Sequence, residues 1–205
     1  MKKVLLYSLS LIILCLPLCL KAQDFKFGLQ FGITPSQVDG DGMSGYNKIG
    51  LTGGAFVSRD LKDNIFLFTD LSFTTKGSRV ASSKNVNYSQ VEISANYIDW
   101  GVYAGYKFTD KIDLKAGLIP SVLIYDSEKT VSGMEVGEKD TFRPFNMLIS
   151  GGLHYRFSKH FALNATYNYS IFSIRKGDYE IFNYDVKVRN AQYHHYINLS
   201  LMYQF

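Results

Sequence analysis

The stretch Tyr97–Tyr125, YIDWGVYAGYKFTDKIDLKAGLIPSVLIY, decides the fold class of this chain. On each side of the polar connection 109–111, apolar side chains recur at every second position, as Ile98 and Trp100 illustrate. This period of two is typical of β-strands with one apolar and one polar face, and a short polar connection joins antiparallel neighbours. The stretch therefore predicts an antiparallel hairpin whose two faces differ in chemistry.

The same alternation continues in both directions from this hairpin. Near the N-terminus, Phe27, Leu29 and Phe31 alternate with polar or small residues. Eight segments share the pattern: 25–33, 49–59, 65–76, 97–108, 112–125, 146–157, 161–174 and 197–205. Strands of this length cross a membrane at the tilt of about 35–45° that is found in barrels. We therefore predict an all-β fold, an eight-stranded antiparallel up-and-down transmembrane β-barrel.

The connections between these segments alternate between short and long. Tight polar turns are predicted at 61–64, 109–111 and 158–160, and long polar loops at 34–48, 77–96, 126–144 and 175–191. Outer-membrane barrels have short turns at the periplasmic rim and long loops outside the cell. The order predicts that both termini lie at the periplasmic rim, as an even number of strands requires.

The first residues are typical of a secretory signal peptide. Two lysines precede the apolar run Val4–Leu20, and Ala22 offers a small residue at a cleavage site. The run is shorter than the ~20 apolar residues of a membrane-spanning helix, so we do not expect an uncleaved anchor. We predict a cleaved signal peptide at 1–22 and an outer-membrane β-barrel domain at 23–205.

Charge and cysteine content narrow the function classes. The formal net charge is +4, but Lys2, Lys3 and Lys21 lie in the predicted signal peptide, and their removal leaves +1 for the mature domain. Charges of both signs are interspersed, so the chain lacks the basic patch that a nucleic-acid partner would require. Both cysteines also lie in the signal peptide, so no disulfide is expected in the mature domain.

Periodicity alone does not decide which face of the barrel is inside. The polar face is rich in Gly, Ser, Thr and Asn, which suits a narrow lumen filled by hydrogen-bonded side chains. The apolar face carries Tyr and Phe near the strand ends, as in the aromatic girdles of membrane barrels. These residues are Phe25, Tyr106, Phe108, Tyr155, Phe157, Phe161, Tyr203 and Phe205. We predict an apolar band that faces the lipid of the bacterial outer membrane; the alternative is a soluble lipocalin-like ligand carrier with the apolar face inside.

Four short motifs carry a family resemblance. They are DLSFTTKG at Asp70–Gly77, NYIDW at Asn96–Trp100, GGLHYRF at Gly151–Phe157 and LMYQF at Leu201–Phe205. With them the chain resembles the PorT-like outer-membrane β-barrel family, which is related in architecture to the small OmpA/OmpX-type barrels. The resemblance spans nearly all of the mature chain, although Trp100 and Gly101 stand where the family often has Ile-Pro. It implies an outer-membrane location without an assigned biochemical role.

Two partners follow from this architecture besides the outer-membrane lipid. A last strand that ends in an aromatic residue, here Phe205, resembles the signal by which the outer-membrane assembly machinery recognises its clients. The long loops offer contact surfaces to an envelope protein or an extracellular partner. The loop 126–144 is the strongest candidate because of its charged residues Glu128, Lys129, Glu135, Glu138, Lys139, Asp140 and Arg143.

The stretch Gly40–Gly45 matches the glycine pattern GxGxxG of dinucleotide-binding sites. Such a site needs a strand before the glycines and a helix after them, whereas this stretch lies in a loop between antiparallel strands. Asp39 and Asp41 would bind a divalent cation weakly at most, and a solvated acidic loop is the simpler interpretation. We predict neither a cofactor site nor a metal site here.

Eight charged or titratable residues fall on the predicted lumen face. They are Asp70, Asp99, Asp113, Lys26, Lys107, Lys115, His154 and Arg156. An unpaired charge in a low dielectric is costly, so we expect these groups to pair across the barrel. The interpretation we favour is a plug that rigidifies a narrow lumen. The alternative, an ion or proton path, needs continuous water, for which a barrel of this size leaves little room.

Two arrangements invite a catalytic or metal-binding interpretation. Ser150 and His154 share one strand face, but the ~13 Å between such positions is too long for a hydrogen bond. His194 and His195 are adjacent, so they point to opposite faces of a strand and cannot chelate one metal. We therefore predict no catalytic, cofactor-binding or metal-binding residue, and a non-enzymatic structural or interaction role. The alternative is a lipid-modifying enzyme with Ser, His and acidic side chains converging at the outer rim.

Overall fold

The computed structural model describes residues 25–61, 63–79, 91–130, 142–176 and 191–205. Eight strands close into one barrel in which each strand is antiparallel to the next and β1 pairs with β8. The strands are β1 (Phe25–Asp39), β2 (Lys48–Asp60), β3 (Ile65–Ser78), β4 (Val91–Lys107), β5 (Ile112–Thr130), β6 (Phe145–Arg156), β7 (Phe161–Ser170) and β8 (Tyr193–Gln204). The fold class predicted from the sequence is confirmed.

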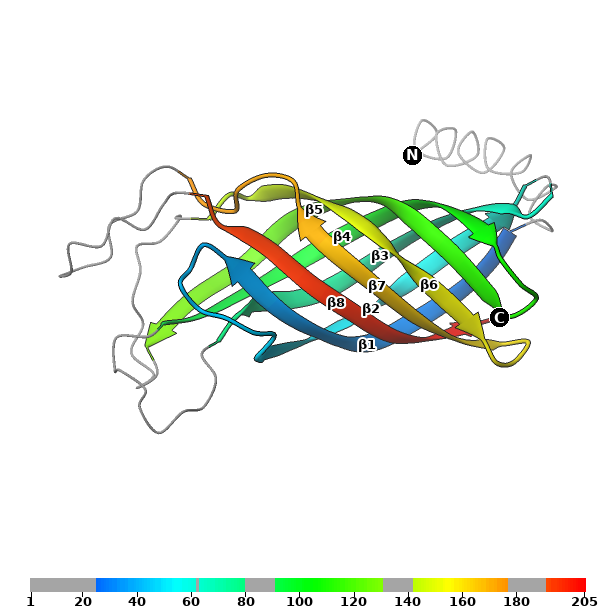
Figure 1. Ribbon diagram of the computed structural model, residues 1–205, viewed down its shortest axis with the longest axis horizontal. Coiled ribbons are helices and arrows are strands. Elements are labelled where there is room, and N and C mark those ends of the chain that lie inside the picture. Colours follow the sequence, from blue (N-terminus) through cyan, green and yellow to red (C-terminus); the bar gives the residue numbers. More distant parts are fainter. Residues whose placement is uncertain (1–24, 62, 80–90, 131–141, 177–190) are drawn as a thin grey trace, which may run out of the picture.

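The two ends of the barrel differ in their connections. Figure 1 shows the β1–β2 connection, residues 40–47, at the left end of the barrel. The turns 61–64, 108–111 and 157–160 lie at the right end together with the C-terminus. We call these the loop end and the turn end. The predicted signal peptide, residues 1–22, lies outside the described ranges.

Within the described ranges, no helix is long and apolar enough to cross a bilayer.

Side chains alternate between an exposed outer face and a buried inner face. On β1, Phe27 and Phe31 are 48% and 65% exposed, whereas Gly28 and Gln30, which lie between them in the sequence, are buried. All of the aromatic residues predicted for the girdle are exposed: Phe25, Tyr106, Phe108, Tyr155, Phe157, Phe161, Tyr203 and Phe205. The predicted outward orientation of the apolar face is therefore confirmed. A soluble carrier would need the reverse orientation, so that alternative is wrong.

Several strands extend further at the loop end than the alternating pattern predicted. β1 reaches Asp39 rather than 33, β4 begins at Val91 rather than 97, β5 reaches Thr130 rather than 125, and β8 begins at Tyr193 rather than 197, while β7 ends at Ser170 rather than 174. The loop bounds predicted from the sequence were wrong to that extent. Pairing continues because backbone N–H and C=O groups keep partners on the neighbouring strand, as in the pair Val38↔His194.

Two apolar clusters lie inside the barrel. The larger extends from the turn end into the middle and contains Phe56, Phe66, Phe68, Tyr103, Ile119, Leu148, Tyr196 and Met202. The second lies at the loop end and contains Val38, Ile93, Phe142 and Ile174. There an isolated β-bridge joins the backbone of Phe142 to that of Arg175. The lumen is thus filled by rings as well as by the small polar residues that the sequence pattern emphasised.

Candidate functional site

Lys76 and Asp99 form an ion pair in the middle of the lumen. Nζ of Lys76 lies 2.8 Å from Oδ2 of Asp99, and both side chains are buried. Lys76 also donates to Oγ of Ser121 at 3.1 Å. The hydroxyl of Tyr196 donates to Oδ2 of Asp99 at 3.1 Å, and its ring centroid lies 4.8 Å from the ammonium group. Partners from β3, β4, β5 and β8 therefore offset the desolvation of both charges.

Asp70 and Lys115 form a second buried layer, nearer the turn end. The side-chain amide of Gln30 donates to the carboxylate of Asp70. The ammonium group of Lys115 lies 4.1 Å from the ring centroid of Phe68 and 4.4 Å from that of Tyr103. The faces of two aromatic rings therefore stabilise the ammonium group of Lys115, and the nearby carboxylate of Asp70 supplies the opposite charge.

Gly101 lies against this layer. It is one of the two positions at which the sequence differs from the usual pattern of the PorT-like family that it resembles. A Cβ there would lie 2.1 Å from Oδ1 of Asp70 and 2.4 Å from the ring of Tyr103, so no larger residue fits without movement. Trp100 faces outward, and its indole N–H donates to Oγ1 of Thr69 at 2.9 Å. Thr69 in turn donates to the carbonyl of Gly101 at 2.8 Å. These outer polar groups are hydrogen-bonded, as an apolar environment requires.

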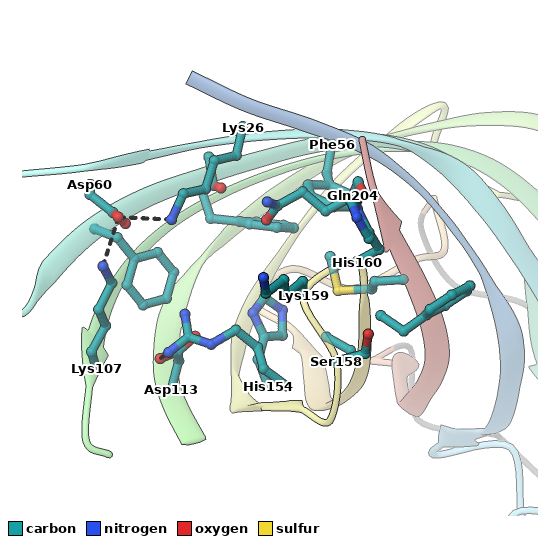
Figure 2. Close-up of a pocket in the computed structure, with 17 residues that line it drawn as sticks. Lys26, Phe56, Asp60, Lys107, Asp113, His154, Ser158, Lys159, His160 and Gln204 are labelled. Carbon is teal, nitrogen blue, oxygen red and sulfur yellow. Dashed lines mark hydrogen bonds and ion pairs between the residues drawn. The ribbon is translucent and has the colours of Figure 1, made fainter. Parts of the chain in front are cut away.

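A pocket of about 60 Å³ opens at the turn end of the lumen. Figure 2 shows Lys26 and Lys107 reaching the carboxylate of Asp60 from two sides, at 2.8 Å and 2.7 Å. Arg156 pairs with Asp113 at 2.9 Å on another part of the wall. We call this feature the turn-end pocket. Its charged side chains are partly exposed, except for the buried Asp113.

The floor of the turn-end pocket is aromatic. The imidazole of His154, which is 6% exposed, lies 5.2 Å from the ring centroid of Phe68 and 6.5 Å from that of Phe66. Its Nε2 atom has no hydrogen-bond partner among the described residues. Ser150 donates instead to Oδ1 of Asn168 at 2.6 Å. No hydrogen bond joins Ser150 to His154 among the described side chains.

The loop end of the lumen is held by a second buried ion pair. Arg175 pairs with Glu128, and both side chains are 6% exposed. Nε of Arg175 donates to Oε1 of Gln192 at 2.6 Å, and the guanidinium group lies 4.6 Å from the ring centroid of Phe142. The sequence pattern placed Glu128 on an exposed contact loop, which is wrong. Lys129 also belongs to β5, while Glu135, Glu138, Lys139 and Asp140 lie outside the described residues.

An outward-facing hydrogen-bonded group lies at the loop end. The hydroxyl of Tyr46 lies 2.9 Å from Nδ1 of His195, and Nε2 of His195 lies 3.0 Å from Oδ1 of Asp39. The hydroxyl of Tyr169 donates to Oδ2 of Asp39 at 3.1 Å. His194 contacts Tyr97 inside the lumen instead, so the prediction of opposite faces for the two histidines is confirmed.

The glycine-rich loop has a structural explanation. Gly40, Gly42 and Gly45 adopt positive φ angles of 87°, 75° and 92°, which glycine allows at little cost. Oδ1 of Asp41 accepts a hydrogen bond from the backbone N–H of Met43 at 2.8 Å, and burial raises the pKa of the Asp41 carboxyl. Among the described residues, no group of three or more His, Cys, Asp or Glu side chains is arranged to hold a metal.

The charged residues predicted for the lumen do lie on its inner side, in the layers described above. The sequence reasoning missed Lys76, Arg175 and Glu128 as lumen residues. Lys76 was detectable, because it continues the inward alternation of Ser72 and Thr74 on β3. Arg175 and Glu128 lie at the loop end, where the alternation of apolar residues does not indicate which side chains face the lumen.

A family model described as outer membrane protein beta-barrel domain matches residues 21–176. No curated protein matches this chain.

Two solved structures have a similar fold. The attachment invasion locus protein Ail of Yersinia pestis is 12% identical, with a TM-score of 0.52 over 89% of this chain and 99% of that chain. Neisserial surface protein A is 14% identical, with a TM-score of 0.56 over 87% of this chain and 97% of that chain. At these identities the similarity concerns the fold alone.

Proposed function

Because the chain belongs to the outer membrane protein beta-barrel domain family and is a β-barrel of the bacterial outer membrane, we propose that it is a non-enzymatic, non-conducting envelope protein. It acts through contacts at its loop end, with an envelope protein or an extracellular partner. Outer-membrane barrels have their short turns in the periplasm, so the turn end faces the periplasm and the loop end faces the outside of the cell. The apolar outer band is surrounded by outer-membrane lipid.

The filling of the lumen is the observation that carries this proposal. Two buried ion pairs, Lys76–Asp99 and Arg175–Glu128, cross the interior at different heights. Apolar rings pack between and around them, and the apolar cluster with Phe142 lies at the loop end. A continuous water path would require these fully paired groups to separate in a low dielectric, which is costly. The interior therefore suits a rigid scaffold for the loops.

Conductance and cross-linking test the two parts of the proposal. In a planar bilayer the purified barrel is expected to give no stable current steps; reproducible steps would contradict the plug. In cells, a photo-cross-linking amino acid at Ser44, in the exposed β1–β2 loop, is expected to trap one partner of discrete mass. The same probe at Lys159, at the turn end, is the control. No adduct at Ser44, or the same adduct at both positions, would overturn the interaction role.

The charged loop 126–144 is tested by replacing only its middle part. Residues 126–130 belong to β5, and residues 142–144 adjoin the bridge to Arg175. Residues 131–141 should therefore be replaced by a Gly-Ser sequence of equal length. We expect assembly to persist and the Ser44 adduct to weaken if this loop shares the contact surface. Loss of the folded barrel would contradict the assignment of this loop to contacts.

A lipid-modifying enzyme is the second candidate function, favoured by one observation. Tyr46, His195 and Asp39 form a hydroxyl–imidazole–carboxylate chain on the outer face at the loop end. The hydroxyl is a phenol and not a serine, and burial raises the pKa of Tyr46, which disfavours the reactive phenolate. Incubation with outer-membrane lipids followed by mass spectrometry is expected to show unchanged lipid. A product that disappears in His195→Gln would establish the enzyme instead.

We also propose membership of the PorT-like subgroup and assembly through the C-terminal strand. The motifs at Asp70–Gly77 and Gly151–Phe157 support the subgroup, and the 71% exposed ring of Phe205 supports the assembly signal. Phe205→Ala is expected to lower the amount of barrel in the outer membrane in cells. Refolding of the same variant in detergent is expected to be normal, which separates recognition by the assembly machinery from stability.

A further inference from the structure

The turn-end pocket carries an excess of positive charge. Its charged lining residues are Lys26, Lys107, Arg156 and Lys159 on the positive side and Asp60 and Asp113 on the negative side. The carboxylates are already engaged, Asp60 by two lysines and Asp113 by Arg156. The pocket therefore has two more positive than negative side chains, and it lies at the end of the barrel that faces the periplasm.

One residue that lines this pocket, His154, has a buried ring nitrogen without a hydrogen-bond partner among the described residues. His154 is held between Phe66 and Phe68, and the nitrogen in question is its Nε2. A buried polar atom without a partner is costly, so such atoms in folded proteins usually contact a water or a ligand. His154 itself is one of the residues that line the adjoining cavity.

The size of the cavity limits what enters it. Its volume of about 60 Å³ exceeds the ~10–15 Å³ that a single water molecule requires. A small oxyanion group fits this space, and any larger part of a ligand must remain outside. The exposed turn residues Ser158 and Lys159 line the rim, so a ligand enters from the periplasmic side.

We propose that the turn-end pocket binds a phosphate group, with His154, Lys107 and Arg156 as its contacts. A phosphate monoester carries a charge of about −1.5 to −2 at neutral pH, which matches the two excess positive charges better than one carboxylate does. The planar guanidinium of Arg156 suits phosphate oxygens, and the flexible stem of Lys107 allows its ammonium to turn from Asp60. The phosphate belongs either to a soluble periplasmic molecule or to a lipid headgroup.

Histidine NMR of the full barrel in a maltoside detergent, free of phosphate, tests the proposal. Inorganic phosphate is the first probe, and dihexanoyl phosphatidic acid is the second. We expect the ring nitrogens of His154 and His160 to shift, because both residues line the pocket. His194 and His195 lie at the loop end and serve as internal references.

Matched variants separate a built site from general charge attraction. Lys107→Gln combined with Arg156→Gln is expected to raise the dissociation constant for the probe by at least about tenfold, since charge-assisted hydrogen bonds are lost. Lys111→Gln removes one charge at the same end, outside the pocket lining, and is expected to leave binding unchanged. His154→Phe keeps the aromatic floor and is expected to weaken binding without loss of the folded barrel.

Each outcome decides the proposal. Shifts with inorganic phosphate that vanish in the double variant support the site and a soluble source, whereas shifts with phosphatidic acid alone support the site and a lipid headgroup. No His154 shift with either probe, or equal weakening by Lys111→Gln, would show that the cavity holds only water and would overturn the proposal. Heat-modifiable gel migration reports folding for every variant.

Discussion

The two ends of the lumen hold ion pairs in opposite environments. At the loop end, Arg175 and Glu128 are 6% exposed and packed against Phe142. At the turn end, Lys26 and Asp60 are 38% and 37% exposed beside an open pocket. A buried pair that loses one partner leaves an uncompensated charge, whereas a partly exposed pair is solvated again by water. The difference implies that the loop end seals the barrel and that the turn end is accessible to ligands.

The largest expected effect comes from breaking the sealed end. Glu128→Gln keeps side-chain size and removes the anion that pairs with the buried guanidinium of Arg175. We expect the free energy of unfolding to fall by about 3–5 kcal/mol, measured by urea denaturation in detergent micelles.

A double variant serves as the control for this experiment. Glu128→Leu with Arg175→Met replaces both charges by apolar groups and should recover most of the stability, because no buried charge remains. If Glu128→Gln costs less than about 1 kcal/mol, then water reaches this pair and it is no better shielded than the ion pairs at the turn end.

The second prediction tests how closely the lumen is packed around Asp70, between the loop end and the turn-end pocket. Gly101→Ala would place a Cβ 2.1 Å from the carboxylate of Asp70 and 2.4 Å from the ring of Tyr103, above the turn-end pocket. Overpacking of this kind costs about 1–3 kcal/mol of unfolding free energy. Gly151→Ala is the matched control, since a Cβ there meets no atom within 4 Å, and its effect should stay within about 0.5 kcal/mol. Equal effects would show that the layer around Asp70 is as loose as the outer face.

The sequence was sufficient to predict much of this molecule. Period-two alternation together with alternating short and long connections predicted the strands and their closure, and the composition of the two faces predicted the outward apolar face. It also placed Asp70, Asp99 and Lys115 in the lumen, because the inward positions of a regular strand follow from parity alone. Pairing partners inside the lumen, such as Ser121 for Lys76, depend on strand register, which a single sequence does not specify.

The failure at Glu128 has a specific physical cause. On β5 the even-numbered Leu114 and Leu118 face outward, so parity predicts an outward Glu128. The register of β4 against β5 shifts between Asn96 and Tyr97, which reverses the faces further along β5. Glu128 is therefore directed into the lumen, where Arg175 lies. A β-bulge of this kind leaves no clear signal in the sequence.

The third prediction concerns the outer face of the loop end. Tyr46→Phe removes the hydroxyl that bonds Nδ1 of His195 and is expected to cost about 0.5–1.5 kcal/mol. The loss should appear as faster amide hydrogen exchange in residues 40–47, with the rest of the barrel unchanged. Tyr106→Phe, an outward tyrosine at the turn end, is the control. Unchanged exchange in the loop would mean that the seal does not depend on this outer contact.

The smallest effect is expected at the open end, where Lys26→Gln removes one of the two lysines on Asp60. Lys107 still pairs with that carboxylate at 2.7 Å, and water reaches the site, so the free energy of unfolding should change by less than about 1 kcal/mol. The change should shrink further at high salt, which screens partly exposed charges but leaves the Glu128→Gln effect largely intact. A cost near that of Glu128→Gln would mean that the turn end is as tightly closed as the loop end. A phosphate group would then have no access to His154.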